Sequence, residues 1–167
     1  MTPENEADTN PETRLETSPE QAPSADQRPI VVGIDGSQES RRALRWACEQ
    51  AHPRGCGVLA VAVWHVYPLT SADRVGSSPW WFTTDPDIAT QTFLEDVVAP
   101  VAGDFPDVMI SRVVRSGRAP EELARLSHLA QMIVVGAKGR GGVAGMLLGS
   151  TSRDVLERAS CTVIVVR

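Results

Sequence analysis

Two kinds of hydrophobic pattern alternate along this chain. Short runs rich in valine and isoleucine, apolar on both faces, predict strands buried in a parallel sheet. Between these runs, hydrophobic residues recur every three or four positions, which predicts amphipathic helices beginning near Ser37, Asp85, Pro120 and Ser150. The predicted strands cover residues 30–34, 58–66, 108–115, 132–135 and 162–166.

The order of these elements predicts an α/β fold. Strands that alternate with helices form right-handed crossovers, and the result is a Rossmann-like, five-stranded parallel sheet with helices on both faces. Residues 108–115 alternate between polar and apolar, which favours a half-exposed strand at an edge. Ligands bind such sheets at the carboxyl ends of the strands, so we expect the turn 33–37 and the loop 136–149 to meet there.

Composition divides the chain into two parts. Residues 1–28 hold seven acids and two bases, a net charge of −5, and few large aliphatic side chains. Such a segment cannot bury enough apolar surface to fold, so it is predicted to be a disordered acidic tail. Residues 29–167 are predicted to form one domain; with fourteen acids and fourteen bases they carry no net charge. This neutrality argues against nucleic acid or an anionic membrane as a partner.

The remaining composition favours a reducing compartment. No apolar run approaches the ~20 residues that span a bilayer, and the polar, acidic start of the sequence does not resemble a secretory signal. The three cysteines, Cys48, Cys56 and Cys161, form no CxxC pair. Cys48 and Cys161 lie in apolar patterns and are interpreted as small buried hydrophobic residues. We therefore expect a cytoplasmic protein.

The glycine-rich loop after the fourth predicted strand carries the strongest chemical signal. Six of its fourteen residues, 136–149, are glycine, which lets backbone N–H groups approach an anion closely. A helix start follows at Ser150, Thr151 and Ser152, where unpaired N–H groups and hydroxyls suit a phosphate. Lys138, the only lysine of the chain, and Arg140 add positive charge.

Two familiar phosphate-binding templates do not fit this loop. Gly136 and Gly141 have the Walker A spacing, but Gly142 replaces the lysine that the template requires. The match of Gly139, Gly141 and Ala144 to the dinucleotide fingerprint lies late in the chain, with no acid-bearing strand behind it. A flexible connector without a ligand is the alternative interpretation, and the position of the loop at the expected crevice argues against it.

The spacing of the loop resembles the nucleotide-binding motif of the universal stress protein family. That motif is GxxG, nine residues, then G and Ser or Thr, and the chain matches it from Gly136-x-x-Gly139 to Gly149-Ser150. The first predicted strand and turn, VVGIDGS from Val31, and the ending LLGSTSRDVLERASCTVIVV also resemble the family. The resemblance covers residues 29–167 and implies strand order 3-2-1-4-5 with a pocket for ATP.

The resemblance also implies which residues bind the nucleotide. Asp35, alone a plausible cap of its turn, becomes a contact to the ribose and the one candidate ligand for an accompanying Mg²⁺ ion. Val66 would touch the adenine, and Lys138 and Arg140 occupy variable positions of the motif. The implied binding residues are Gly33, Asp35, Val66, Val135, Gly136, Lys138, Gly139, Arg140, Gly149, Ser150, Thr151 and Ser152.

These implications point to an ATP-binding regulator of stress responses rather than a metabolic enzyme, with no catalytic residue assigned. Two alternatives remain: a member of the family that binds cAMP, and a slow ATP hydrolase or self-phosphorylating enzyme. The strand 162–166 would leave an apolar sheet edge. The family implies that this edge pairs across a homodimer axis. A downstream protein partner is not identified by the sequence.

Overall fold

A computed structural model describes residues 27–64, 85–141 and 147–167 of the chain. Its centre is a parallel sheet of five strands in the order β3-β2-β1-β4-β5, which confirms the predicted fold class and strand order. The strands are β1 (Ile30–Ile34), β2 (Val58–Trp64), β3 (Ile110–Ser116), β4 (Met132–Gly136) and β5 (Thr162–Val166).

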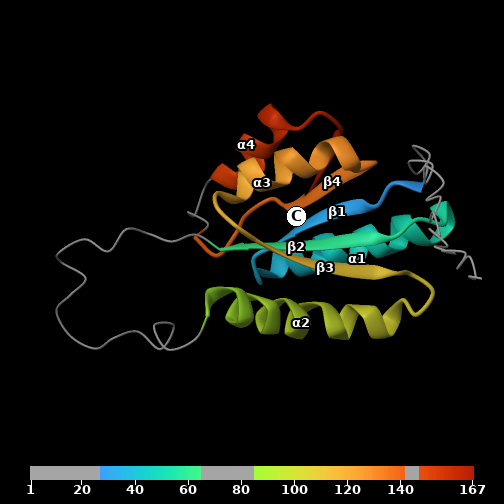
Figure 1. The fold of residues 1–167 in the computed structure, drawn as a ribbon. Helices are drawn as coiled ribbons and strands as arrows, with labels where there is room; N and C mark the ends of the chain where they lie inside the picture. Colours follow the sequence, from blue (N-terminus) through green and yellow to red (C-terminus); the bar gives the residue numbers. More distant parts are fainter. Residues whose placement is uncertain (1–26, 65–84, 142–146) are drawn as a thin grey trace, which may run out of the picture.

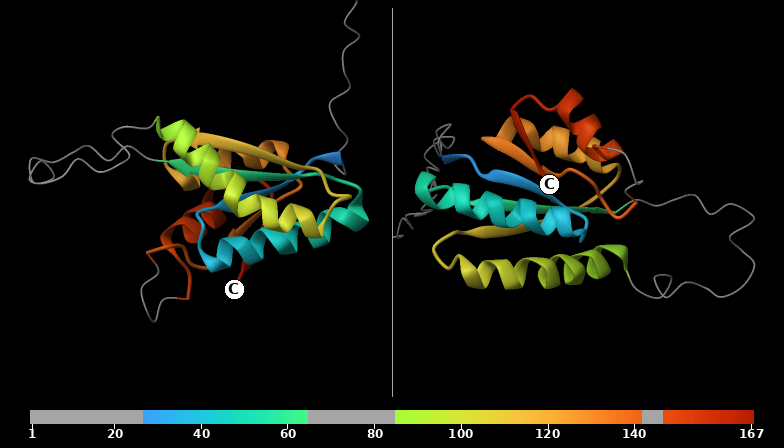
Figure 2. Two further views of the ribbon diagram at one scale, coloured as in Figure 1. Left: turned by 90° about the horizontal axis from the view of Figure 1, so that it is seen from below. Right: turned by 180° about the vertical axis from the view of Figure 1, so that it is seen from behind.

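Helices cover both faces of the sheet. In the view of Figure 1, α1 and α2 lie on one face, whereas α3 and α4 lie on the other. Seen from below, α1 and α2 run side by side beneath the strands (Figure 2). The helical segments are α1 (Gln38–Arg54), α2 (Pro86–Asp104), α3 (Ala119–Leu126), the short 3₁₀ turn η4 (Ser127–Leu129) and α4 (Ser150–Arg158).

Helix α1 begins and ends where capping chemistry predicts. The Ser37 hydroxyl accepts a hydrogen bond from the Ser40 N–H, and Gly55 ends the helix in the left-handed conformation with φ of 61°. His52 and Pro53 lie within the last turn of the helix. Proline has no backbone N–H to donate, and Gly55 ends the helix two residues later, so Pro53 interrupts few of the helix hydrogen bonds.

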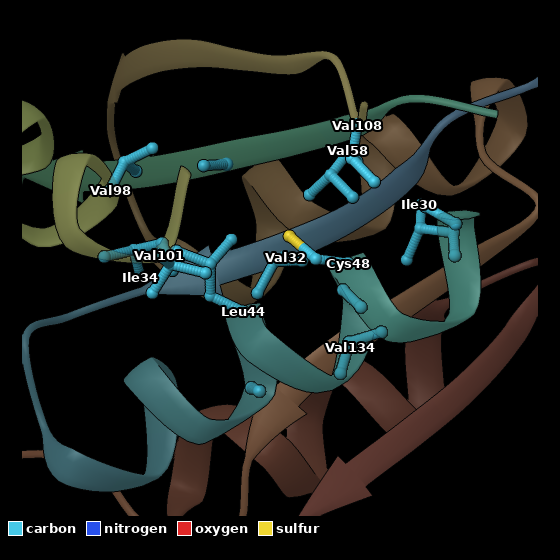
Figure 3. Packing of buried hydrophobic residues seen from close by; sticks show 14 of the residues in the cluster. Ile30, Val32, Ile34, Leu44, Cys48, Val58, Val98, Val101, Val108 and Val134 are labelled. Atoms are coloured by element: carbon cyan, nitrogen blue, oxygen red, sulfur yellow. The ribbon is translucent and has the colours of Figure 1, made fainter. Parts of the chain in front are cut away.

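The face covered by α1 and α2 holds the larger core. Figure 3 shows Ile30, Val32 and Ile34 of β1 packed against Leu44 and Cys48 of α1. Fully buried aliphatic side chains of this kind each stabilise the fold by ~1.5–3 kcal/mol relative to exposure. Burial also raises the pKa of the Cys48 thiol to about 11, so Cys48 is a core residue, as the sequence predicts.

The second core lies under α3 and α4. Val31, Val61 and Ile133 project from three neighbouring strands onto Leu123 of α3 and Val155 of α4. Since strand side chains alternate between faces, the even-numbered residues of β1 face α1 and the odd-numbered residue Val31 faces α3. Both faces of β1 are therefore buried, as its uninterrupted apolar run predicts.

The two sheet edges are β3 and β5, as the sequence predicts. The order reverses between β1 and β4, and their carboxyl ends lead into the turn at Asp35 and the glycine-rich segment. Within the described residues, no helix is long and apolar enough to cross a membrane. The predicted tail (apart from residues 27–28) and residues 65–84, which include Val66, lie outside the described part of the chain.

Candidate functional site

A cavity of about 370 Å³ opens at the carboxyl ends of β1 and β4, where the strand order reverses. Eleven of the twelve residues predicted to bind a nucleotide line this cavity, and the twelfth, Val66, lies outside the described residues. The predicted residues that the structure brings together are Gly33, Asp35, Val135, Gly136, Lys138, Gly139, Arg140, Gly149, Ser150, Thr151 and Ser152.

One side of the cavity is apolar, and sequence reasoning did not assign its residues. Val61 and Val63 come from β2, and Ala119 and Leu123 come from α3. Their signal in the sequence is indirect, since both valines share the face of their strand that carries the second core. Only the packing of α3 over β2 shows that this face continues into the cavity.

The other side of the cavity is polar. It is made by Lys138, Arg140 and the first residues of α4, which follow β4. Because β2 and β4 lie on opposite sides of β1, the apolar and polar sides face each other across the carboxyl end of β1. The cavity therefore suits an elongated ligand with an apolar ring at one end and an anion at the other.

The turn after β1 is organised by the Asp35 carboxylate. Its Oδ1 accepts hydrogen bonds from the Ser37 hydroxyl at 2.6 Å and the Ser37 N–H at 2.9 Å. Its Oδ2 accepts a longer hydrogen bond of 3.3 Å from the Arg140 N–H. Burial by itself raises the pKa of Asp35, but the hydrogen bonds from Ser37, Ser40 and Arg140 outweigh it and leave the pKa lowered. Asp35 is thus ionised at neutral pH and joins the turn to the glycine-rich segment.

Glycine stands at three positions of the segment for different physical reasons. A Cβ on Gly136 would lie 2.7 Å from Glu39 Cβ and 2.9 Å from the Glu39 carbonyl carbon, so this glycine lets α1 approach β4. A Cβ on Gly139 would overlap Asp35 Oδ2. A Cβ on Gly149 would meet ordinary contacts only, the nearest at 3.5 Å from the Ala137 carbonyl oxygen. Packing of the fold therefore requires glycine at positions 136 and 139 but not at position 149, where a side chain would have space.

The start of α4 faces the cavity with unpaired donors. Gly149 is the N-cap and no side chain caps the helix, so the first N–H groups have no partner within it. Ser150 and Thr151 are exposed in the cavity. Ser152 is buried, and its hydroxyl donates to the Gly136 carbonyl at 2.7 Å. The Ser152 hydroxyl thus anchors α4 to β4, whereas contact of its N–H with a phosphate stays a prediction.

The two cations of the segment are held differently. Lys138 is half-buried in the cavity wall, and its carbonyl accepts a 3.4 Å hydrogen bond from the Ser37 hydroxyl. Arg140 is exposed, and its guanidinium lies over the Phe93 ring at 4.9 Å from the ring centroid. Both residues line the polar side of the cavity, where positive charge favours an anionic ligand.

Within the described residues, no group of three or more histidine, cysteine, aspartate or glutamate side chains is placed to hold a metal ion. Asp35 is the only carboxylate among the described residues that line the cavity. A lone carboxylate matches the way Mg²⁺ is usually bound beside a nucleotide, with phosphates and waters as its other ligands. The prediction that Asp35 contacts a divalent ion therefore stays a prediction.

The arrangement fits a nucleotide by its chemistry. Glycines and the start of α4 form a concave surface of N–H groups and hydroxyls, which suits phosphate oxygens. Val61, Val63 and Leu123 offer an apolar surface for a base. The backbone at Gly33 and the Asp35 side chain lie between the two, where a ribose would join them.

The chain matches the model of the universal stress protein family over residues 27–167. It is 38% identical over 145 residues to the universal stress protein Rv2005c of Mycobacterium tuberculosis, covering 87% of this chain and 47% of that one. It is also 38% identical over 149 residues to the universal stress protein Rv2623 of the same organism, with the same coverage. The chain thus spans about half the length of the curated relatives it matches.

Solved structures with the same fold include the universal stress protein UspA of Lactobacillus plantarum, with a TM-score of 0.60, 19% identity, and coverage of 84% of this chain and 98% of that one. A universal stress protein of Archaeoglobus fulgidus in complex with dAMP has a TM-score of 0.56, 21% identity, and coverage of 84% and 98%. A universal stress protein in complex with cAMP has a TM-score of 0.57, 23% identity, and coverage of 84% and 97%.

Proposed function

The chain belongs to the universal stress protein family, and we propose that it binds ATP in the crevice at the carboxyl ends of β1 and β4. In this proposal the bound nucleotide makes the protein a regulator of a stress response. The observation that carries it is the crevice itself, which joins an apolar wall to a surface of glycine backbone and helix N–H groups. Solved family members in complex with dAMP and cAMP support an adenine nucleotide as the ligand class.

Each part of the nucleotide has a counterpart in this chain. The adenine packs against the apolar wall of Val61, Val63 and Leu123, and the ribose lies at Gly33 and Asp35. The phosphates lie beside Gly149, whose N–H donates to the Ala137 carbonyl, and receive hydrogen bonds from the backbone of Gly139 and from Ser150 and Thr151 at the start of α4. Lys138 and Arg140 supply positive charge to the same end. A bound Mg²⁺ ion would neutralise phosphate charge, with Asp35 as its protein ligand.

The same residues argue for binding without rapid turnover. A general base must hold a water against the terminal phosphate, and Asp35 is the only carboxylate among the described cavity residues. Its Oδ1 already accepts two hydrogen bonds from Ser37, its lowered pKa makes it a weak base, and the Mg²⁺ ion of this proposal would take its remaining acceptor sites. We therefore propose a nucleotide-dependent regulator, with slow hydrolysis or self-phosphorylation as the upper limit of its chemistry.

A cAMP-binding role is the second candidate, and the solved family member in complex with cAMP favours it. A cyclic phosphate carries one negative charge and occupies less of the polar end than a triphosphate. The polar side of this cavity holds two cations and the start of α4, more than one phosphate needs. The extent of that side is why we place ATP first.

We further propose that two copies of the chain pair through β5. After the exposed Thr162, this strand is apolar from Val163 to Val166, and these four residues are half-exposed along the free edge of the sheet, where the strand presents outward backbone groups. Antiparallel pairing of two β5 strands would cover the β5 edge of each copy and leave both β3 edges free. We also propose that the chain acts in the cytoplasm and regulates a downstream protein, whose identity the site does not specify.

Calorimetric titration of the full chain with ATP, ADP, AMP and cAMP, with and without Mg²⁺, tests the ligand. We expect affinity to rise from AMP to ATP, because added phosphates reach more of the polar side. Tighter binding of cAMP than of ATP would favour the second candidate. Absence of binding to all four at millimolar concentration would contradict the proposed function, and steady turnover above about one per second would contradict the regulator.

A further inference from the structure

A contact between α2 and the glycine-rich segment crosses the carboxyl edge of the sheet. Phe93 belongs to α2, on the face opposite α3 and α4, and its ring packs against the larger core. Arg140 follows β4, and its guanidinium carbon lies 4.9 Å from the centroid of this ring. Such cation–π contacts are attractive within about 6 Å. The segment that lines the polar side is thus joined to a helix that does not line the cavity.

The turn beneath this contact is built to let it form. Gly36 has φ of 80°, and a Cβ there would lie 2.7 Å from both Arg140 Nη2 and Phe93 Cε2. Glycine at this position therefore serves two ends, since it adopts the left-handed conformation and leaves room for the stacked pair. Any larger residue would push the guanidinium and the ring away from the turn.

The other contacts of the segment to the turn are long. The Arg140 N–H donates to Asp35 Oδ2 at 3.3 Å, and the Ser37 hydroxyl donates to the Lys138 carbonyl at 3.4 Å. Both lie beyond the usual range for their donors, so each is weak alone. None of the ion pairs between described residues includes Arg140. The stack on Phe93 is therefore the contact through which the Arg140 side chain adds to these two bonds.

We propose that Phe93 is a positioning residue for the phosphate-binding segment, acting through Arg140. Its ring holds the guanidinium, and the held guanidinium keeps residues 138–140 against Asp35 and Ser37, with their backbone facing the cavity. This inference rests on the proposed function, because it assigns Phe93 a part in the binding of the phosphates. It predicts that loss of the ring weakens the binding of a nucleoside triphosphate far more than the binding of a nucleoside without phosphate.

The chain offers a matched control for this test. Phe105 follows the last residue of α2, also packs against the larger core, and lies under Arg45 at 5.7 Å from the ring centroid. It therefore carries the same kind of contact as Phe93, at the end of the same helix, without any residue of the cavity. Phe93→Tyr keeps an aromatic face for Arg140 and serves as the conservative variant.

The experiment measures dissociation constants for ATP with Mg²⁺ and for adenosine on the full chain by calorimetry. In Phe93→Ala we expect ATP to bind about three- to fivefold more weakly, the effect of one exposed cation–π contact, with adenosine changed less than about twofold. Phe93→Tyr and Phe105→Ala should leave both constants within about twofold. In an Arg140→Ala background, Phe93→Ala should add nothing further, because the partner of the ring is already absent.

The outcomes separate this inference from its premise. If the unmodified chain binds neither ligand, the proposed function fails and the inference with it. If the unmodified chain binds ATP but Phe93→Ala weakens ATP and adenosine equally, or weakens ATP as strongly in the Arg140→Ala background, Phe93 acts through general packing and the inference alone is overturned. An effect of Phe105→Ala equal to that of Phe93→Ala would overturn it too.

Discussion

At the scale of single residues, the glycines of the site divide into those that the fold requires and those that a ligand requires. Gly136 lets the first turn of α1 approach β4, with no space for a Cβ beside Glu39. Gly149 has extended backbone with φ of −72° and only ordinary contacts around an added Cβ. The motif in the sequence treats both glycines alike, and only the packing separates them.

Alanine should therefore lower the stability of the fold at Gly136 and the affinity for ATP at Gly149. Gly136→Ala forces the neighbouring backbone apart and should lower the free energy of unfolding by about 1–3 kcal/mol. Gly149→Ala should change it by less than about 0.5 kcal/mol. Its methyl group would lie beside Lys138 Cα and the Gly139 nitrogen, and should weaken ATP by about tenfold. Urea denaturation and calorimetric titration of both variants measure the two effects. A Gly149→Ala chain that is stable and binds ATP normally would contradict the assigned cradle.

Asp35 predicts a specific dependence of stability on pH. Its pKa in the folded chain lies below the ordinary value of 3.8, so the folded state binds its proton less readily than the unfolded state. The ionised Asp35 thus contributes stability above pH 3.8, and this contribution is lost as the pH falls through the lowered pKa.

Replacing Asp35 by asparagine removes this titration. The free energy of unfolding of Asp35→Asn should fall less steeply with decreasing pH below about 4 than that of the unmodified chain. Urea denaturation at stepped pH values measures both curves. Parallel curves through that range would show that the hydrogen bonds from Ser37 and Arg140 do not favour the ionised form.

At the scale of elements, a buried serine joins the end of α3 to the start of β5. The Ser127 hydroxyl donates to the Ala124 carbonyl at 2.6 Å and accepts from the Ser160 N–H at 3.0 Å. Ser127 is buried, whereas Ser160 is exposed. The link positions β5 beside β4 before the chain reaches its last strand.

Removing the Ser127 hydroxyl should therefore cost more than removing that of Ser160. Ser127→Ala leaves the Ser160 N–H without its acceptor and should lower the free energy of unfolding by about 1–3 kcal/mol. Ser160→Ala loses the 2.8 Å contact with the Ser127 hydroxyl and the 3.1 Å contact with His128 Nδ1 but keeps the Ser160 N–H on its acceptor, so the change should be smaller, below about 1 kcal/mol. Chemical denaturation compares the two variants. Equal changes would mean that Ser127 is not the link described here.

Most elements could be predicted from local pattern because their signals are local. The apolar run at β1, the cap at Ser37 and the Asp85-Pro86 start of α2 are each signalled by a few consecutive residues, and the structure confirms all three. Ile88 shows the limit: it lies in the pattern of α2 yet is 61% exposed, because the helix buries only its later residues against the sheet.

The site could be predicted only as far as its motif extends. The motif named the residues after β1 and β4, which the structure brings to one cavity. The apolar wall of Val61, Val63 and Leu123 depends on how α3 packs over β2, which no spacing in the sequence specifies. The contact of Phe93 with Arg140 joins a residue of α2 to one that follows β4, far apart in the sequence, and carries no sequence signal either.

At the scale of the whole molecule, the exposed edge at β5 decides how two copies would meet. The Val166 carbonyl accepts from the Ala137 N–H, so Val166 faces β4. Backbone groups alternate in direction along a strand, and Val165 therefore presents its N–H to the free edge. At the opposite edge, the Met109 carbonyl accepts from the Val58 N–H, so Arg112 presents its N–H outward from β3.

Proline at each edge tests the proposed dimer. Val165→Pro removes an outward N–H from β5 without breaking the bonds to β4, and should convert a dimer of twice 18.0 kDa into a monomer. Arg112→Pro removes an outward N–H at the β3 edge, together with the ion pair between Arg112 and Glu95, and should leave the dimer intact. Light scattering after size-exclusion chromatography gives the masses. A monomeric unmodified chain, or a Val165→Pro dimer, would contradict pairing through β5.

The central claim is that backbone amides between β4 and α4 hold the phosphates of a nucleotide. The most direct test follows the amide signals of the ¹⁵N-labelled chain by NMR during titration with ATP and Mg²⁺. We expect the largest changes at Gly139, Gly149, Ser150 and Thr151. Changes confined to residues away from the crevice, or no change at millimolar ATP, would contradict it.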